Sequence, residues 1–164
     1  MPTGKRVYFD TNVFIIALEG KDAEQRDLLA TLFALARSGG EQRFFTSQIT
    51  ISEVLVGPYK HGQNDLAGYY QRFLFDSPWL SAVPITTDIL QKAAMLRAGH
   101  KSLKLPDAIH LATALEYDCS YFVSADMGIR DLQTSLPGKR PSSSLTVRRL
   151  DAESLRSLIK SLTP

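Results

Sequence analysis

The sequence predicts an α/β sandwich, with a short, mainly parallel sheet of about five strands flanked by helices. Short apolar runs typical of strands alternate along the chain with longer segments whose apolar residues have helical spacing. This alternation is the pattern of parallel strands joined by helices. The length of 164 residues fits one domain, predicted over residues 1–164.

The first half of the chain predicts two strands and four helices. In chain order these are a strand at 7–9, a helix with apolar residues at 13–17, a helix from Asp22 to Gly39-Gly40, a strand at 44–45, a helix capped by Ser47 that ends near Gly57-Pro58, and a helix at 67–75. Asp22 and Ser47 suit helix N-caps, because their side-chain oxygens accept hydrogen bonds from free backbone N–H groups. Paired glycines are a typical helix stop.

The second half predicts three more strands and three more helices. They are a strand at 82–85, a helix from Thr86-Thr87 to about Gly99, a helix opened by Pro106, strands at 121–124 and 145–150, and a last helix capped by Asp151. Pro106 suits a first helical turn, where its missing N–H is not needed. The Pro- and Ser-rich stretch at 137–144 predicts a surface loop.

Composition excludes several classes of protein. The chain is 44% hydrophobic and 22% charged, which is typical of a globular protein and not of a disordered or collagen-like one. The single cysteine, Cys119, allows neither an intrachain disulfide nor a cysteine-cluster metal site, and it favours a reducing, cytoplasmic location. We expect no signal peptide, no spanning helix and no membrane partner. The net charge of +2 neither requires nor excludes nucleic acid.

Four carboxylates stand where a parallel sheet gathers its functional groups. Asp10 and Asp126 follow the first and fourth strands, while Glu53 and Asp107 lie near helix starts, Glu53 about two turns into its helix. Function in such sheets collects outside the carboxyl ends of the strands, where the following helices also begin. We therefore expect these four acids to converge.

A cluster of four carboxylates needs compensation for its charge. Two unit charges about 4 Å apart repel by about 4 kcal/mol at an effective dielectric near 20. The cluster must therefore share protons or hold a divalent cation, and oxygen ligands favour Mg²⁺ or Mn²⁺. Such a cation activates water and neutralises charge on a phosphate, so phosphodiester hydrolysis is the natural reaction.

Each acid also has a structural interpretation on its own. Asp10 and Asp126 suit a cap and a turn, Asp107 suits the positive end of a helix, and Glu53 suits a solvated helix face. The four together favour a site, because all four structural interpretations would have to hold at once. His110, one turn after Asp107, could face the site, but it is better interpreted as a solvated helix residue. The sequence has no phosphate-binding glycine loop and no H-E-x-x-H motif.

Four motifs resemble those of PIN-domain ribonucleases, in the same order, across about residues 6–132. They are Val7-Tyr8-Phe9-Asp10-Thr11-Asn12, Thr50-Ile51-Ser52-Glu53-Val54, the run from Leu105-Pro106-Asp107 to Ala114, and Phe122-Val123-Ser124-Ala125-Asp126. The size and layout are similar to the VapC toxins of toxin–antitoxin pairs. The third motif is the most specific of the four.

The resemblance implies a PIN-like fold and a Mg²⁺- or Mn²⁺-dependent endoribonuclease. Asp10 and Asp107 would be metal ligands, Asp126 would complete the metal site, and Glu53 would bind a second metal or orient the attacking water. Thr11, Asn12 and Ser124 would support the carboxylates by hydrogen bonds. In one respect the sequence departs from the family pattern, because it lacks the aromatic residue that is often found shortly after the last aspartate. Asp131 is therefore an alternative that could assist or replace Asp126.

The resemblance also implies partners, namely an RNA substrate, a second copy of the chain in a homodimer and a cognate antitoxin that blocks the acidic cleft. Basic residues that could meet RNA phosphates are Arg97, Lys101, Lys104, Arg130, Lys139, Arg140, Arg148 and Arg149. Residues that fit either a partner surface or the core are Tyr69, Tyr70, Phe73 and Trp79. Two other functions remain open, a non-catalytic RNA- or protein-binding module and a metal-dependent phosphatase.

Overall fold

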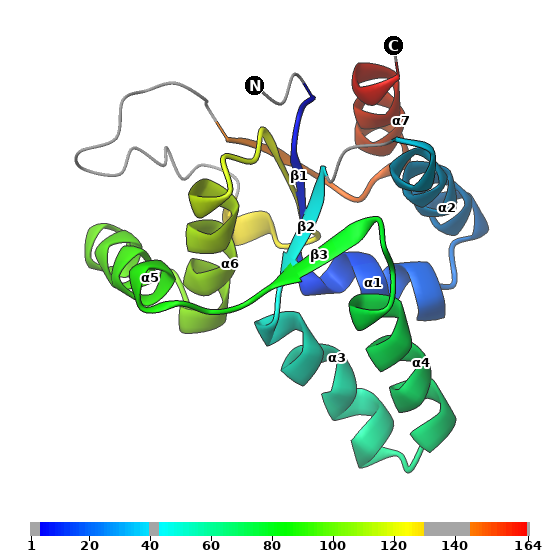
Figure 1. Ribbon diagram of the computed structural model, residues 1–164, viewed down its shortest axis with the longest axis horizontal. Coiled ribbons are helices and arrows are strands. Elements are labelled where there is room, and N and C mark those ends of the chain that lie inside the picture. The colour runs from blue at the N-terminus through cyan, green and yellow to red at the C-terminus, as the bar shows by residue number, and fades with distance from the viewer. Residues whose placement is uncertain (1–3, 40–42, 130–144, 164) are drawn as a thin grey trace.

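The computed structural model describes residues 4–39, 43–129 and 145–163 (Figure 1). Its centre is one five-stranded sheet in the order β3-β2-β1-β4-β5, and every neighbouring pair is parallel. The strands are β1 (Val7–Phe9), β2 (Phe44–Ser47), β3 (Leu80–Val83), β4 (Tyr121–Val123) and β5 (Thr146–Arg148). The predicted α/β sandwich with a short parallel sheet is confirmed.

Seven α-helices are present within the described ranges, and they cover both faces of the sheet. They are α1 (Thr11–Glu19), α2 (Ala23–Ser38), α3 (Ile49–Lys60), α4 (Asn64–Phe75), α5 (Thr87–Gly99), α6 (Leu105–Glu116) and α7 (Ala152–Leu162), and a short 3₁₀ helix, η1, spans Met127–Ile129. In Figure 1, α5 and α6 lie to the left of the sheet and α1, α2 and α7 to the right, while α3 and α4 form a hairpin below.

Alternation along the central strand separates two cores. Val7 and Phe9 of β1 pack into a cluster with residues of α1, α2, α4 and α7. Tyr8, between them, points to the opposite face and packs with α5, α6 and β4, where its ring stacks on Phe122. Because successive side chains of a strand alternate, a three-residue strand serves both layers.

Most predicted helix starts are confirmed by their hydrogen bonds. Asp22, Thr86 and Asp151 are N-caps whose side chains accept from backbone N–H groups three residues on. Ser47 is instead the last residue of β2, and the N-cap of α3 is Gln48. Glu53 consequently lies about one turn into α3, closer to the sheet edge than the sequence indicated.

Several predicted boundaries differ from the structure. The helix predicted at 67–75 begins at Asn64, three residues earlier. The helix α3 passes through Pro58 and ends at Lys60. Pro58 has no N–H and so gives up one helical hydrogen bond, but its ring is buried, which favours this position. The third strand begins at Leu80, two residues before its predicted start, because the register pairs Phe44 of β2 with Leu80. The predicted loop at 137–144 lies outside the described residues.

Among the described residues, no helix is both long and apolar enough to cross a membrane.

Candidate active site

The first strand delivers Asp10 to the carboxyl edge of the sheet in a fixed orientation. Asp10 is the N-cap of α1, and its Oδ1 accepts a hydrogen bond of 2.7 Å from the backbone N–H of Thr11. Its Oδ2 accepts one of 2.5 Å from the hydroxyl of Ser124. The side chain is buried, with the residue only 4% exposed, so both carboxylate oxygens are held by donors of the protein.

The fourth strand places Asp126 beside this carboxylate. Phe9 pairs with Val123, so the turn after β4 lies next to the start of α1. Within that turn the hydroxyl of Ser124 accepts a hydrogen bond of 3.0 Å from the N–H of Asp126. Asp126 Oδ1 in turn accepts one of 2.7 Å from the N–H of Gly128. Ser124 therefore links the two acids, in line with its predicted supporting role.

Glu53 reaches the same edge from α3. The hydroxyl of Thr11 donates a hydrogen bond to Glu53 Oε2, and His110 Nε2 lies 2.7 Å from the same oxygen. Burial would raise the pKa of Glu53, but the hydrogen bonds from His110 and Thr11 outweigh it and lower that pKa. Glu53 is therefore held as an ionised carboxylate.

His110 corrects the sequence-based interpretation of a solvated residue. It is 1% exposed, and its Nδ1 lies 2.7 Å from the hydroxyl of Tyr8. Two signals could have found it. In the sequence, apolar residues of α6 stand before and after it. The residues from Ala108 to Ala114 are all buried, so that stretch of the helix has no solvated face. Tyr8 also places a hydroxyl inside a buried strand, where such a group needs a partner.

Asp107 joins the cluster from the first turn of α6, and it is partly exposed. Its pKa is raised, first by burial and then by the negative charges of Asp126, Asp10 and Glu53, which the charge of His110 only partly offsets. The charge of each of the other three acids thus acts on Asp107. Asp107 is therefore near enough to the three other acids to be affected by their charges, as the predicted convergence requires.

The supporting residues differ in what they contact. Thr11 and Ser124 bond directly to the acids. Asn12 lies in the first turn of α1, and no hydrogen bond described for residues 4–39, 43–129 and 145–163 joins it to an acid, so its role stays a prediction. Asp131, the alternative to Asp126, lies outside the described residues.

The cluster fits a hard divalent cation by its chemistry. Carboxylate oxygens are the ligands that Mg²⁺ and Mn²⁺ prefer, and a cation would relieve the repulsion that raises the pKa of Asp107. In the part of the chain that the structure describes, however, no three Asp, Glu, His or Cys side chains are close enough to hold a metal ion as they stand.

Several predicted basic residues can be placed. Arg97 donates from Nε to the backbone oxygen of Leu103, just before α6, and Lys104 is the N-cap residue of α6, three residues before Asp107. Arg148 lies over the ring of Tyr121 on β4. The others described are Lys101, which is exposed, and Arg149, which is partly buried. Arg130, Lys139 and Arg140 lie outside the described residues.

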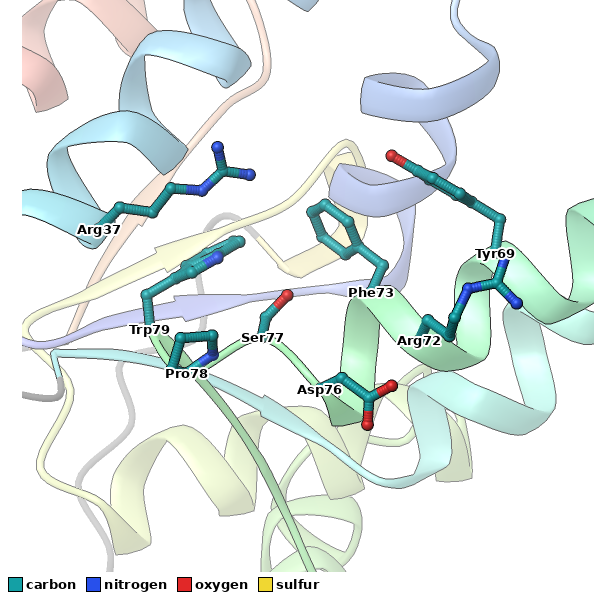
Figure 2. Close-up of a pocket in the computed structure, with 8 residues that line it drawn as sticks. All are labelled: Arg37, Tyr69, Arg72, Phe73, Asp76, Ser77, Pro78 and Trp79. Carbon is teal, nitrogen blue, oxygen red and sulfur yellow. The ribbon is translucent and has the colours of Figure 1, made fainter.

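Of the four residues that fitted either a partner surface or the core, three belong to the core. Tyr70 and Trp79 are buried there and Phe73 packs against it, whereas Tyr69 is 47% exposed. Tyr69 lines a pocket of about 550 Å³ that is shown in Figure 2, together with Phe73 and Trp79. The other lining residues are Arg37, Arg72, Asp76, Ser77 and Pro78. This pocket lies between α2, α4 and the start of β3, and none of the four acids lines it.

Comparison with known families matches the sequence model of the PIN domain to residues 7–134. The chain belongs to the PIN-domain family. The matched region begins at β1 and includes Asp10, Glu53, Asp107 and Asp126, in agreement with the resemblance seen in the four sequence motifs. No protein of curated function matches the sequence.

Solved structures similar to this PIN-domain chain come from toxin–antitoxin systems. A toxin–antitoxin complex from Klebsiella pneumoniae is 27% identical, with a TM-score of 0.55, over 84% of this chain and 98% of that one. DNA-bound VapBC from Salmonella typhimurium is 18% identical, with a TM-score of 0.63, over 90% and 99%. VapC20 from Mycobacterium tuberculosis, described as a sarcin-ricin loop cleaving toxin, is 16% identical, with a TM-score of 0.58, over 71% and 86%. The latter two likenesses establish the shared fold.

Proposed function

We propose that this PIN-domain protein is a metal-dependent endoribonuclease that hydrolyses RNA phosphodiester bonds and acts as the toxin of a toxin–antitoxin pair. The observation that carries the proposal is the placement of acids at one edge of the sheet. Asp10 and Glu53 both face His110 Nε2, at 3.4 and 2.7 Å, and Ser124 joins the Asp10 carboxylate to the backbone of Asp126. Burial and the charges of these three acids raise the pKa of Asp107. Family membership and similarity to VapC20, described as a sarcin-ricin loop cleaving toxin, support the same activity.

Each acid has a role in this proposal. Asp10, Asp107 and Asp126 hold Mg²⁺ or Mn²⁺, and Glu53 binds a second ion or orients the attacking water. A bound ion of this kind lowers the pKa of its water and offsets charge on the phosphate. Thr11 and Ser124 keep Glu53 and Asp10 in position through the hydrogen bonds described above. Water is the nucleophile, and the products are two RNA fragments.

RNA cleavage by purified protein tests the proposal. A mixed RNA pool is incubated with the protein in Mg²⁺, in Mn²⁺ and in EDTA, beside the variant Asp107→Asn. We expect cleavage that requires the metal and falls by about 100-fold or more in the variant, because a ligand of the catalytic ion contributes several kcal/mol. No cleavage of any RNA, or equal cleavage by the variant, would contradict the proposal.

Asp88→Asn is a matched control for that variant. Asp88 lies in the first turn of α5, as Asp107 does in α6, and it is exposed. Both substitutions remove a negative charge from a helix N-terminus, so a loss confined to Asp107→Asn reports on the acid cluster. A phosphomonoester substrate in the same assay separates the nuclease from the alternative phosphatase, and RNA binding without cleavage would favour the alternative binding module.

We also propose an antitoxin partner and a homodimer. The antitoxin is supported by the similar structures, which include a toxin–antitoxin complex and a VapBC complex. Basic side chains of an antitoxin would be attracted to the acid cluster. Co-expression with the product of the adjacent gene tests this proposal, since that partner should co-purify and suppress cleavage. Light scattering of the purified chain tests the dimer, and a mass of 18.2 kDa would contradict it.

A further inference from the structure

A buried histidine connects the central strand to Glu53. His110 Nδ1 lies 2.7 Å from the hydroxyl of Tyr8, and His110 Nε2 lies 2.7 Å from Glu53 Oε2. Tyr8 itself is fully buried between β2 and β4. Two hydrogen bonds thus connect Tyr8 in the core, through His110, to Glu53 in the acid cluster. The function proposed above assigns no role to them.

The neighbours of Nε2 determine where its hydrogen is. Three oxygens face this nitrogen, those of Glu53 at 2.7 Å, Thr11 at 3.2 Å and Asp10 at 3.4 Å. The two carboxylate oxygens already accept hydrogen bonds, from the Thr11 hydroxyl and the Thr11 N–H respectively. The single hydroxyl hydrogen of Thr11 is used on Glu53, so toward His110 that oxygen only accepts. All three neighbours are acceptors, and Nε2 must therefore carry a hydrogen.

We propose that His110, held by Tyr8, is a positioning residue that donates its Nε2 hydrogen to Glu53 Oε2 and so reserves Oε1 for a cation or the attacking water. The role of Oε1 in this proposal rests on the proposed function. The way in which Glu53 is held rests on the hydrogen bonds alone. Among the described residues, Oε2 has two donors and Oε1 has no hydrogen bond.

The packing around His110 keeps its ring in this orientation. The Tyr8 ring meets the imidazole edge-on, with the ring centroids 5.9 Å apart. The same tyrosine ring stacks on Phe122, with a centroid distance of 5.2 Å. The histidine is buried on a helix whose neighbouring residues are also buried. A ring flip would put carbon atoms, Cδ2 and Cε1, in the places of Nδ1 and Nε2 and break the bonds to both Tyr8 and Glu53, so these hydrogen bonds and the packing together fix the donor.

Nuclear magnetic resonance of the histidine rings tests the donor directly, in full-length, metal-free protein. We expect a hydrogen on Nε2 of His110, with a correlation that is absent from the variant His110→Gln. His61 is an internal contrast, because it is exposed and its Nδ1 lies 2.8 Å from the carbonyl oxygen of Gly57, which requires a hydrogen on Nδ1. An unprotonated Nε2 on His110 would overturn the proposal, whatever the protein cleaves.

A pair of substitutions tests the consequence for the site. The side-chain amide of His110→Gln can replace the Nε2 donor, whereas His110→Ala cannot. Loss of a residue that orients a metal ligand typically costs about 10–100-fold in affinity or activity. We therefore expect His110→Ala to weaken Mn²⁺ binding, measured by calorimetry, by about 10-fold or more, and His110→Gln to restore most of it. The control His61→Ala should bind Mn²⁺ as the unmodified protein does.

The outcomes separate this proposal from the nuclease proposal. Unchanged Mn²⁺ affinity in a folded His110→Ala, or equal loss in folded Gln and Ala variants, would overturn the positioning role. If His110→Ala does not fold, His110→Gln and the resonance measurement still decide the matter. Absence of RNA cleavage by the unmodified protein would instead contradict the nuclease, while the position of the hydrogen on His110 would stand as measured.

Discussion

The two halves of the acid cluster differ in how the protein treats their charge. Asp10 and Glu53, the held pair, accept hydrogen bonds from the Thr11 N–H, the Thr11 hydroxyl, Ser124 and His110. Asp107 and Asp126, the open pair, are partly exposed, as Glu53 also is, and fewer side-chain donors are described for them. Of these, Asp126 accepts a hydrogen bond from Gly128, and the pKa of Asp107 is raised by burial and by its acidic neighbours.

This difference follows from where each acid lies. Asp10 caps α1, where free N–H groups and the positive end of the helix favour a negative charge. Glu53 faces side-chain donors from α1 and α6. Asp107 also lies at a helix start, but burial and the three other acids outweigh that benefit. The fold itself stabilises the held pair, whereas the proposed cation would neutralise the charge of the open pair.

The largest expected effect on stability separates Asp10 from Asp107. Asp10→Ala removes a helix cap and leaves the buried Ser124 hydroxyl without its acceptor, so the free energy of unfolding should fall by about 2 kcal/mol. Asp107→Ala should leave the metal-free protein as stable as before, or stabilise it, because repulsion is relieved. Urea unfolding in EDTA measures both, and equal losses in the two variants would remove the distinction between held and open pairs.

Ser124 offers a sharper test of the held pair. Ser124→Ala deletes the donor to Asp10 Oδ2 and the acceptor of the Asp126 N–H. Since a buried polar group left unsatisfied costs about 1–3 kcal/mol, we expect a loss of about 1 kcal/mol in urea unfolding. The control is Ser157→Ala on the exposed surface of α7, which should change stability by less than about 0.5 kcal/mol. A loss of the same size in the control would show that the bonds of Ser124 contribute nothing specific.

Asp107 of the open pair should change how the free energy of unfolding depends on pH. A raised pKa in the folded state means that folding favours the protonated acid, so Asp107 opposes folding above that raised pKa. The stability advantage of Asp107→Asn in metal-free protein should therefore be full at neutral pH and vanish as the pH falls toward the ordinary carboxyl value of 3.8. Unfolding of both proteins across this range measures the difference, and an advantage that grows on acidification would contradict this sign.

The smallest effect is expected at Gly128, which holds Asp126. A Cβ at this position would lie 3.3 Å from Asp126 Oδ1, closer than ordinary van der Waals contact. Gly128→Ala should therefore shift the Asp126 carboxylate by a few tenths of an ångström and lower RNA cleavage severalfold, with stability nearly unchanged. Gly57→Ala is a suitable control, because a Cβ there meets open space. Equal cleavage by the two variants would show that the position of Asp126 is not critical.

The sequence predicted what local chemistry determines. Caps such as Asp22 and Asp151 have a side-chain signal within three residues of their partners, and the structure confirms both. The convergence of the acids followed from strand ends and helix starts in a parallel sheet. These predictions needed only the order of the elements along the chain.

What the sequence missed depends on contacts between distant residues. The pairing of Tyr8 with His110 joins residues 102 positions apart, and the polarity of the histidine alone suggested solvent. The start of β3 is set by its register with β2, and the course of α3 through Pro58 by burial of the ring. Apolar spacing along one segment contains none of this information.

Calorimetric titration of metal-free protein with Mn²⁺ tests the central claim most directly, that the open pair is completed by a divalent cation. The unmodified protein and Asp88→Asn should bind Mn²⁺ with the same affinity, and Asp107→Asn should bind it at least about 10-fold more weakly, since it lacks a charged ligand. No binding by the unmodified protein, or equal binding by Asp107→Asn, would contradict the account.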